Sequence, residues 1–518
     1  MEESPVAIIG AGPTGMAAAA LLARYGVRSI LFEREADVMT IPRAVHLDEE
    51  VLRVLHLCCL GEEASREIRP IRGMQLVDRE LRTLVSFARE GRGPHGFARS
   101  NAFDQPELEA AMRRALAREP LVTVRTSTSV EAVEHLPTGR LRVSFQDRAR
   151  GALGELETPA VLACDGARSR TRAFVGTDFE DLGFEGRWLV VDVATDATLE
   201  LYEGCLQVAD PARPTTYFCT GGGRHRWEIM LRDGETADEM TRESHVRALL
   251  EPWLGAATGS ATLRRRAVYT FHSLVARRFR RGNVFLLGDA AHQTPPFIGQ
   301  GMGAGIRDAA NLAWKVAAVV QGRARRTLLD TYELERRPHV RSVIAQAVLL
   351  GRTMRATLGG RHRDRAIRTL GSVRALHEMF VRKAFPELRC GPMIGPCSSG
   401  RAGGHVPRAT IEIDGRITHL DDVLGDDFAL LSLERGPAEG AAKVGIRRFG
   451  ESATPRTVID REGTLRAWLR ELRAESALVR PDRVVMASGD AAAAPAWIEA
   501  LSEHCGWQTR PAAVERAR

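Results

Sequence analysis

Apolar residues near the start of the chain fall into two strand-length runs with a helix-like segment between them. Residues 6–10 and 27–32 are almost continuously apolar, and residues 14–25 form an Ala/Leu-rich stretch that stops before Gly26. Continuous apolar runs of this length are typical of buried strands, and glycine commonly follows the last helical residue. The pattern therefore predicts a strand, a helix and a second strand, which together form a parallel βαβ unit.

The pattern changes further along the chain. Residues 122–133 and 160–164 predict further strands, and residues 183–271 contain short runs separated by turn residues, which predict a mostly antiparallel sheet. A buried strand at 283–287 and a long helix at 303–320 follow, and the last part of the chain has a smaller α/β pattern. The predicted segments are residues 1–182, 183–274, 275–400 and 401–518.

Composition and charge exclude several classes of function. The net charge of +7 comes almost entirely from arginine, and no basic block alternates with aromatic residues, so we expect no nucleic-acid partner. The eight cysteines include no CxxC pair and no zinc-like spacing, so we expect reduced thiols and no metal site. Because no long apolar run is present and the first residues are acidic, we expect a cytoplasmic protein without a membrane partner.

A glycine motif lies between the first strand and the first helix. Gly10 allows a tight turn, Gly12 lets the backbone approach a pyrophosphate, and Gly15 lets the helix pack closely on the strand. The helix N-terminus then directs free N–H groups at the phosphates, and Glu33 lies at the distance expected of a residue that binds ribose hydroxyls. This motif predicts a bound dinucleotide but does not separate FAD from NAD.

A second motif places Asp165 directly after the strand at 160–164. Its carboxylate either caps the following helix or contacts a bound nucleotide, and the sequence leaves both open. Two other glycine-rich segments match the glycine spacing of a nucleotide-binding motif but lack the helix or the acidic strand end that such a motif requires. Residues 91–96 open no apolar helix and are interpreted as a loop, and residues 299–304 precede a helix that no acidic strand end follows.

A third motif decides the interpretation. The strand at 283–287 ends in Gly288-Asp289, which puts a carboxylate where it can accept hydrogen bonds from a polyol. A Pro/Gly loop (residues 295–300) then leads into the long helix, and the backbone N–H groups around Gly301 are not covered by side chains. A reduced flavin is negatively charged along one edge, and a helix N-terminus stabilises such an anion by about 0.3–1 kcal/mol.

These three motifs, in this order and spacing, resemble the class A flavoprotein aromatic hydroxylases, the para-hydroxybenzoate hydroxylase-like family. Residues 42–50, 103–109 and 226–228 are similar to segments of 3-(3-hydroxyphenyl)propionate hydroxylases and aromatic-polyketide hydroxylases. The resemblance implies an α/β fold: a Rossmann-like FAD-binding domain in two parts (1–182 and 275–400), an inserted antiparallel β-sheet substrate domain and a C-terminal thioredoxin-like domain. That last domain has no CxxC here, and its lone Cys505 suggests packing or a homodimer contact.

The resemblance also implies which residues hold FAD. The ADP half is assigned to Gly10, Gly12, Gly15, Glu33 and Arg34, and the pyrophosphate or ribityl region to Arg43. Gln105 matches a family residue near the flavin chain, Asp165 belongs to a motif shared by FAD and NAD(P)H contacts, and Asp289 is assigned to the ribityl hydroxyls. The cofactor-binding loop includes Pro296, Gly299, Gly301 and Met302, of which the last two offer backbone N–H groups to the isoalloxazine ring. The chain carries no second complete nucleotide fingerprint, so NADPH or NADH is expected to bind transiently at the FAD domain's own surface.

The implied reaction is hydroxylation of a phenolic ring by NAD(P)H and O2 through a flavin C4a-hydroperoxide. A base that takes the phenol proton is expected, and the candidates are His46, His292 and Tyr217. Each has a structural alternative. In that alternative His46 caps the following helix, His292 only braces the Gly-Asp loop, and Tyr217 is part of the core of the sheet. The small aromatic substrate is expected between the antiparallel sheet and the flavin, near Tyr217, Trp227 and Met230.

Other functions either remain alternatives or are disfavoured because a required motif is missing. A tailoring hydroxylase or Baeyer–Villiger oxygenase of an aromatic polyketide carries indistinguishable FAD motifs and remains an alternative. A flavin halogenase is disfavoured because no WxWxIP segment is present, and a disulfide reductase because no CxxC lies near the first helix. A non-catalytic FAD-binding protein is the alternative from a different class.

Overall fold

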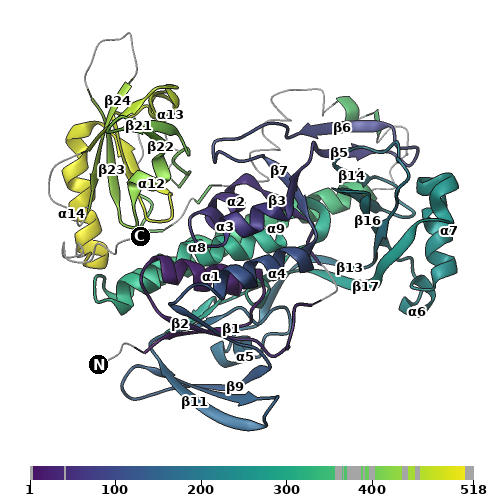
Figure 1. Cartoon of the computed structure of the whole chain (residues 1–518), viewed down its shortest axis with the longest axis horizontal. Helices are drawn as coiled ribbons and strands as arrows, with labels where there is room; N and C mark the ends of the chain where they lie inside the picture. The colour runs from purple at the N-terminus through teal and green to yellow at the C-terminus, as the bar shows by residue number, and fades with distance from the viewer. Residues whose placement is uncertain are drawn as a thin grey trace.

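The computed structural model describes residues 4–39, 43–355, 364–365, 367–369, 387–388, 391–395, 403–434, 442–449 and 456–507. Figure 1 shows three main parts: a central α/β part, a large sheet with two helices on its outer side, and a separate C-terminal α/β part. Over these ranges no helix combines the length and the apolar character that crossing a bilayer requires.

The central part is built on a six-stranded sheet whose order is β18-β19-β12-β1-β2-β8. Its strands are β1 (Val6–Ile9), β2 (Ser29–Phe32), β8 (Val122–Arg125), β12 (Val161–Ala163), β18 (Arg280–Arg281) and β19 (Val284–Leu286). All neighbours except β18 and β19 are parallel, and β1, β12 and β19 are buried along their full length, as expected for a sheet covered on both faces. The predicted βαβ unit is confirmed.

Helices α1 (Pro13–Arg24) and α8 (Gly301–Val320) are buried in one core with this sheet. The predicted single strand at 122–133 is wrong, because Ser127 has a φ of 51° and separates β8 from β9 (Thr128–His135). Strand β9 belongs to a three-stranded antiparallel sheet with β10 (Leu141–Asp147) and β11 (Ala152–Thr158), which forms the lower edge of the molecule in Figure 1.

The segment between β2 and β8 contains the remaining small elements of the central part. They are β3 (His46–Asp48), α2 (Glu49–His56), α3 (Gly61–Arg66), β4 (Ile68–Pro70), β7 (Ser100–Phe103) and α4 (Gln105–Leu116). Strands β3, β7 and β4 form a small antiparallel sheet. Asp48 caps α2 with its side chain, which accepts a hydrogen bond from the Val51 N–H at 3.1 Å.

The second large sheet has eight strands in the order β20-β17-β13-β16-β15-β14-β5-β6. They are β5 (Gly73–Val77), β6 (Thr83–Ala88), β13 (Phe179–Ala194), β14 (Cys205–Val208), β15 (Thr215–Gly221), β16 (Arg224–Met230), β17 (Thr262–Ala276) and β20 (His292–Gln293). The sheet is antiparallel except where β14 pairs with β5. It therefore extends beyond the expected range 183–274, because β5, β6 and β20 join it from outside.

The two faces of this sheet have different neighbours. Tyr217 and Trp227 are directly opposed across β15 and β16, and they share an apolar cluster with α7 (Glu243–Leu254). Residues directly opposite one another across antiparallel strands point to the same face, and adjacent residues point to opposite faces. Gln207 and Glu228, which both oppose Thr216, therefore lie on the face turned away from α7. We call this the inner face.

The C-terminal part contains a seven-stranded sheet flanked by helices. Its elements are β21 (Thr410–Ile413), β22 (Arg416–His419), α12 (Leu420–Leu424), β23 (Ala429–Leu433), β24 (Ala442–Arg448), β25 (Arg456–Asp460), α13 (Thr464–Glu471), β26 (Ser476–Val479), β27 (Val485–Gly489) and α14 (Ala494–Cys505). A thioredoxin-like fold for this part stays a prediction. Buried ion pairs join it to the rest of the chain, among them Arg53 with Asp421 at 2.6 Å and Arg480 with Glu335 of α9 (Asp330–Arg355) at 3.0 Å.

Candidate active site

The glycine turn after β1 is shaped by two close backbone approaches. Gly10 has a φ of 99°, and a Cβ on it would lie 2.4 Å from the Cys164 carbonyl oxygen. A Cβ on Gly15 would lie 2.0 Å from the Gly10 carbonyl oxygen, whereas a Cβ on Gly12 would meet no atom within 4 Å. The first turn of α1 carries no acidic side chain and no side-chain cap. The turn therefore leaves open space beside Gly12 at a positive helix end, which suits a phosphate.

Glu33 follows β2 and folds back over this turn. Its Oε2 accepts a hydrogen bond from the Ala11 N–H at 2.8 Å, and its Oε1 accepts one from the Glu35 N–H at 2.9 Å. Arg34 is exposed and forms an ion pair with Glu35 at 3.1 Å. The carboxylate is thus held at the edge of the glycine turn, where a ribose attached to the phosphate would lie.

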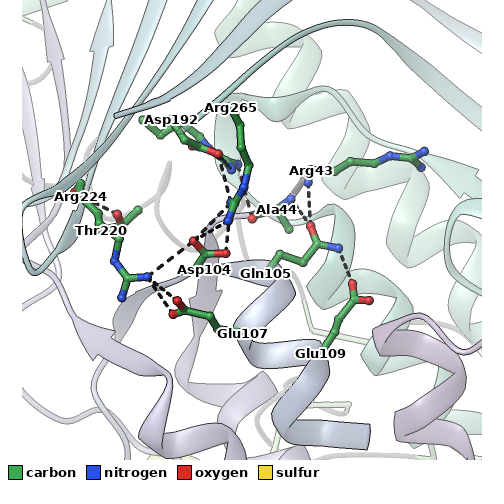
Figure 2. A network of polar contacts seen from close by, with 11 residues as sticks. Arg43, Ala44, Asp104, Gln105, Glu107, Glu109, Asp192, Thr220, Arg224 and Arg265 are labelled. Atoms are coloured by element: carbon green, nitrogen blue, oxygen red, sulfur yellow. Dashed lines mark hydrogen bonds and ion pairs between the residues drawn. The ribbon is translucent and has the colours of Figure 1, made fainter. Parts of the chain in front are cut away.

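Gln105 holds the chain segment that carries Arg43. Figure 2 shows its side chain at the start of α4, between the backbone of Arg43 and Ala44 and the carboxylate of Glu109. Its Oε1 accepts hydrogen bonds from the Arg43 and Ala44 N–H groups, both at 2.7 Å, and its Nε2 donates to Glu109 Oε1 at 2.6 Å. One amide therefore fixes the direction in which Arg43 leaves the backbone.

A network of arginines and aspartates connects this segment to the second sheet. Arg226 Nε donates to Asp192 Oδ1 at 2.7 Å, and its Nη1 donates to the Ala44 carbonyl at 3.5 Å. Figure 2 shows Arg265 between Asp192 and Asp104, with ion-pair distances of 3.4 and 3.2 Å. Charge-assisted hydrogen bonds beside the inner face therefore join the eight-stranded sheet to the segment before β3 and to the start of α4.

Two aspartates of the sequence motifs have acceptor capacity left over. Asp165 Oδ2 accepts from the Thr171 N–H and hydroxyl at 3.2 and 3.0 Å, but its buried Oδ1 has no hydrogen-bond partner in the described structure. One oxygen thus holds the first residue of the following helix, α5 (Thr171–Val175), and the other is free for a ligand. Asp289 is half-buried, and burial raises the pKa of its carboxyl against the opposing charges of Arg43 and His292.

Asp308 of α8 holds the loop that carries Asp289. Its Oδ2 accepts hydrogen bonds from the Gly288 N–H at 3.0 Å and from His292 Nε2 at 2.6 Å, and its Oδ1 accepts from Arg336 Nε at 2.7 Å. Burial opposes ionisation of this carboxyl, but the charges of His292 and Arg336 outweigh burial and hold its pKa at about 2. Both members of the His292–Asp308 pair are fully buried, and His292 Nδ1 has no hydrogen-bond partner among the described residues, so a role of His292 as the base stays a prediction.

The Pro/Gly loop before α8 lies against the inner face. The Phe297 carbonyl accepts a hydrogen bond from Gln207 Nε2 at 3.1 Å, and the Phe297 ring contacts Trp188 edge-on at 5.6 Å between centroids. Gly299 follows the short 3-10 turn Pro296–Ile298 with a φ of 60°. The first turn of α8 then begins at Gly301 with no acidic side chain and no side-chain cap. These free N–H groups suit the anionic edge of a flavin.

Glu228 on the inner face was not among the candidates from the sequence. It is 2% exposed, its Oε2 has no hydrogen-bond partner among the described residues, and the guanidinium of Arg226 lies 4.0 Å from its Oε1. Burial raises the pKa of this carboxyl to about 7, despite the opposing charge of Arg226. The available signal was a single glutamate inside the otherwise apolar run at 227–231.

Comparisons with known proteins agree with this geometry. Residues 3–347 match the FAD binding domain family, and residues 403–504 match the HcaD C-terminal domain family. A 3-(3-hydroxy-phenyl)propionate/3-hydroxycinnamic acid hydroxylase of Mycobacterium sp. (strain JLS) is 34% identical over 95% of this chain and 90% of the relative. The hydroxylase of the same name from Burkholderia cenocepacia (strain HI2424) is 34% identical over 94% of both chains. The chain belongs to the FAD-dependent aromatic hydroxylases.

Solved structures show the same fold across the hydroxylase. The flavin-dependent monooxygenase PieE, in complex with FAD and substrate, superposes with a TM-score of 0.78 at 20% identity, over 97% of this chain and 98% of that one. Aklavinone-11 hydroxylase, in a ternary complex with FAD and aklavinone, superposes with a TM-score of 0.73 at 22% identity, over 97% and 99%. The resemblance drawn from the three sequence motifs is thus confirmed.

The proposed base His46 lies beside the Pro/Gly loop of the hydroxylase. Its Nε2 is 2.9 Å from Ser100 Oγ and its Nδ1 is 3.4 Å from the Gly299 carbonyl. Burial, with a contribution from Arg89, lowers the pKa of this imidazole to about 4, so it is neutral near pH 7. His46 therefore contacts the part of the chain expected to hold the isoalloxazine ring.

The expected substrate residues divide between the two faces of the sheet. Met230 lies on the inner face with Glu228 and opposes Trp188. Tyr217 and Trp227 lie on the outer face against α7, and the Tyr217 hydroxyl is 2.8 Å from His225 Nδ1. Burial raises the pKa of Tyr217 well above its usual range. The hydroxylase therefore brings Met230, but not Tyr217 or Trp227, to the face that meets the Pro/Gly loop.

The pKa of Glu228 predicts how the stability of the hydroxylase depends on pH. An unfolded glutamate ionises near pH 4.5, whereas the folded carboxyl keeps its proton up to about pH 7. In this interval the native state binds more protons than the unfolded state, so the contribution of Glu228 to the free energy of unfolding falls as pH rises, by about 3 kcal/mol. Urea unfolding across this range should show a smaller fall for Glu228→Gln than for the wild type. An equal fall in both proteins contradicts the assignment.

Proposed function

We propose that this hydroxylase adds one oxygen atom of O2 to the ring of a phenolic aromatic acid of the 3-(3-hydroxyphenyl)propionate type, with NADPH or NADH as the reductant. The relatives that are 34% identical over nearly the whole chain carry that substrate in their names. The observation that carries the proposal is the buried carboxyl of Glu228 on the inner face, the face that the Pro/Gly loop contacts through Gln207. We further propose that the enzyme works in the cytoplasm and that it forms a homodimer.

The residues at the glycine turn and the Pro/Gly loop suit the two ends of FAD. The N-terminus of α1 beside Gly12 would hold the pyrophosphate, and Glu33 would accept hydrogen bonds from ribose hydroxyls. Asp289 would bind the ribityl chain, and the N–H groups of Gly301 and Met302 would meet the isoalloxazine ring. When bound, FAD supplies hydride acceptance and transfer of oxygen to the ring carbon.

Glu228 is proposed as the group that takes the phenol proton. A phenolate ring is more electron-rich than a phenol ring, so proton removal favours attack on electrophilic oxygen. A carboxyl with a pKa near 7 matches a general base at neutral pH, because a large fraction is ionised and it still holds protons well. The substrate would lie between Met230 and the Pro/Gly loop, where the buried rings of Trp188 and Phe297 would exclude water.

An aromatic polyketide is the second candidate substrate. Aklavinone-11 hydroxylase, which was solved with aklavinone, shares the fold over 97% of this chain but is only 22% identical. A panel that contains 3-(3-hydroxyphenyl)propionate, 3-hydroxycinnamate and a tetracyclic phenol distinguishes the two. We expect the small acids to accelerate NAD(P)H oxidation and to yield a hydroxylated product. Acceleration by the tetracyclic phenol alone would replace the first proposal with the second.

The glycine turn allows a test of FAD binding that separates ligand contact from folding. Alanine at Gly12 meets no protein atom within 4 Å, so Gly12→Ala is expected to fold normally but to bind FAD at least about tenfold more weakly, because its methyl group occupies the ligand's space. Fluorescence titration of the apoprotein with FAD measures this. Gly15→Ala is the comparison, because its Cβ collides with the Gly10 carbonyl and should impair folding itself. Unchanged FAD affinity in Gly12→Ala contradicts the placement of the pyrophosphate.

A further inference from the structure

Three side chains that commonly bind metal ions meet where the C-terminal part contacts the central part. They are Glu50 on α2, His95 in the loop before β7, and His405 at the start of the C-terminal part. One ligand atom of each lies within 4.8 Å of the other two, and His405 Nε2 is 3.8 Å from Glu50 Oε1. No spacing in the sequence predicts this cluster, because its members come from three distant segments.

The two imidazoles are available as ligands. His95 Nδ1 is buried and has no hydrogen-bond partner in the described structure, which is costly for a polar atom that binds nothing. The backbone N–H of His95 donates to Glu49 Oε2 at 3.1 Å and so fixes the position of the loop. An imidazole in its neutral form offers a ring-nitrogen lone pair to a metal ion.

The carboxylate of Glu50 is oriented by a neighbour. Arg307 Nε donates to Glu50 Oε1 at 2.8 Å, and Arg307 Nη2 donates to Asp48 Oδ2 at 2.6 Å. One guanidinium thus contacts both carboxylates and orients that of Glu50. Such outer partners commonly orient metal ligands.

A cavity of about 330 Å³ opens beside the cluster and is lined by all three residues. It is large enough for water molecules to complete the coordination of an ion and for the ion to enter. Ligand atoms bound at about 2.0–2.2 Å from one tetrahedral ion lie roughly 3.3–3.6 Å apart. The observed separations therefore require the site to contract by about one ångström, which side-chain rotations can supply.

We propose that Glu50, His95 and His405 bind one divalent transition-metal ion of the zinc class, with water in the remaining position, and that the ion links the C-terminal part to α2. Two imidazoles and a carboxylate are a donor set that suits Zn²⁺ and disfavours Mg²⁺, which prefers oxygen ligands and retains its waters. None of the three ligands is among the residues assigned to FAD, so the proposal does not depend on the proposed substrate.

The test measures Zn²⁺ on the full-length protein with FAD bound and without a histidine tag. The protein is first freed of metal by chelation and dialysis and is then titrated with Zn²⁺. We expect one tightly bound Zn²⁺ per chain, and we expect that Mg²⁺ does not compete for the site. His95→Gln and His405→Gln should each weaken Zn²⁺ binding at least 100-fold, whereas His339→Gln, which changes a histidine of the same cavity outside the cluster, should weaken it less than threefold. Absent stoichiometric binding, or equal affinity in all three variants, overturns the proposal.

A measurement on the wild type covers the case in which a variant fails to fold. X-ray absorption at the zinc edge should show two imidazole nitrogens and oxygen neighbours at about 2.0–2.2 Å. Zn²⁺ should also raise the unfolding temperature of the wild type and of His339→Gln, since an ion that binds only the native state stabilises it. A spectrum without histidine ligands overturns the proposal.

Discussion

Glu228→Gln is expected to lower kcat/KM for hydroxylation of the best substrate by about 10²–10⁴-fold while the FAD content stays unchanged, because the amide cannot take the phenol proton. The pH profile provides a second readout. Only the ionised carboxylate acts as a base, so kcat/KM of the wild type should rise with pH through the pKa of about 7 and then level off. The variant should lack that rise. Product formation and NAD(P)H oxidation, measured together from pH 5.5 to 8.5, give both results.

The matched control is Glu185→Gln, a glutamate on the same sheet whose side chain is 71% exposed. It should leave the rate, the coupling of NAD(P)H oxidation to product and the pH profile unchanged. If Glu228→Gln keeps the wild-type pH profile, the base is another group, and His46 beside Gly299 becomes the next candidate to replace.

Asp308→Asn is expected to lower the free energy of unfolding by about 3–5 kcal/mol. Asp308 is fully buried and interacts with the Gly288 N–H, His292 and Arg336. Removing one partner of a buried ion pair leaves the other charge uncompensated, which costs much more than losing an exposed pair. Urea unfolding at pH 7 measures the change. Because Gly288 precedes Asp289, we also expect weaker FAD retention on gel filtration.

Asp330→Asn provides the comparison for Asp308→Asn. Asp330 pairs with Arg280 at 2.7 Å, but its side chain is 61% exposed, so its loss should change stability by less than about 1 kcal/mol. A small effect of Asp308→Asn, similar to that of Asp330→Asn, would show that the loop is held by its backbone and not by this carboxylate.

The alternation of side chains across β16 explains why the substrate residues were hard to choose from the sequence. Trp227 and Glu228 are neighbours in the chain and point to opposite faces. Antiparallel sheets commonly have one solvent-exposed face, and the alternation of polar and apolar residues then identifies the buried face. Here α7 covers the outer face and the Pro/Gly loop contacts the inner one, and both Trp227 and Glu228 are buried. The pattern at 227–231 therefore did not indicate which face meets a ligand.

The interactions between segments that are close in sequence could be predicted without knowledge of the fold. The turn from Gly10 to Gly15, the helix after it and Glu33 form one βαβ unit, in which each residue's role follows from its position relative to the strand ends. The Gly288-Asp289 turn and the helix that begins at Gly301 are equally local. Local backbone geometry is encoded by nearby residues, so the sequence by itself determined the FAD-binding elements and, through their order, the family.

Contacts between distant segments were decided by the tertiary structure alone. Asp308 reaches Arg336, Gln207 reaches Phe297, and Glu50, His95 and His405 converge from three parts of the chain. The raised pKa of Glu228 likewise comes from burial between elements that are far apart in sequence. Desolvation and ion pairing depend on which surfaces the fold brings together, and no pattern of neighbouring residues specifies that.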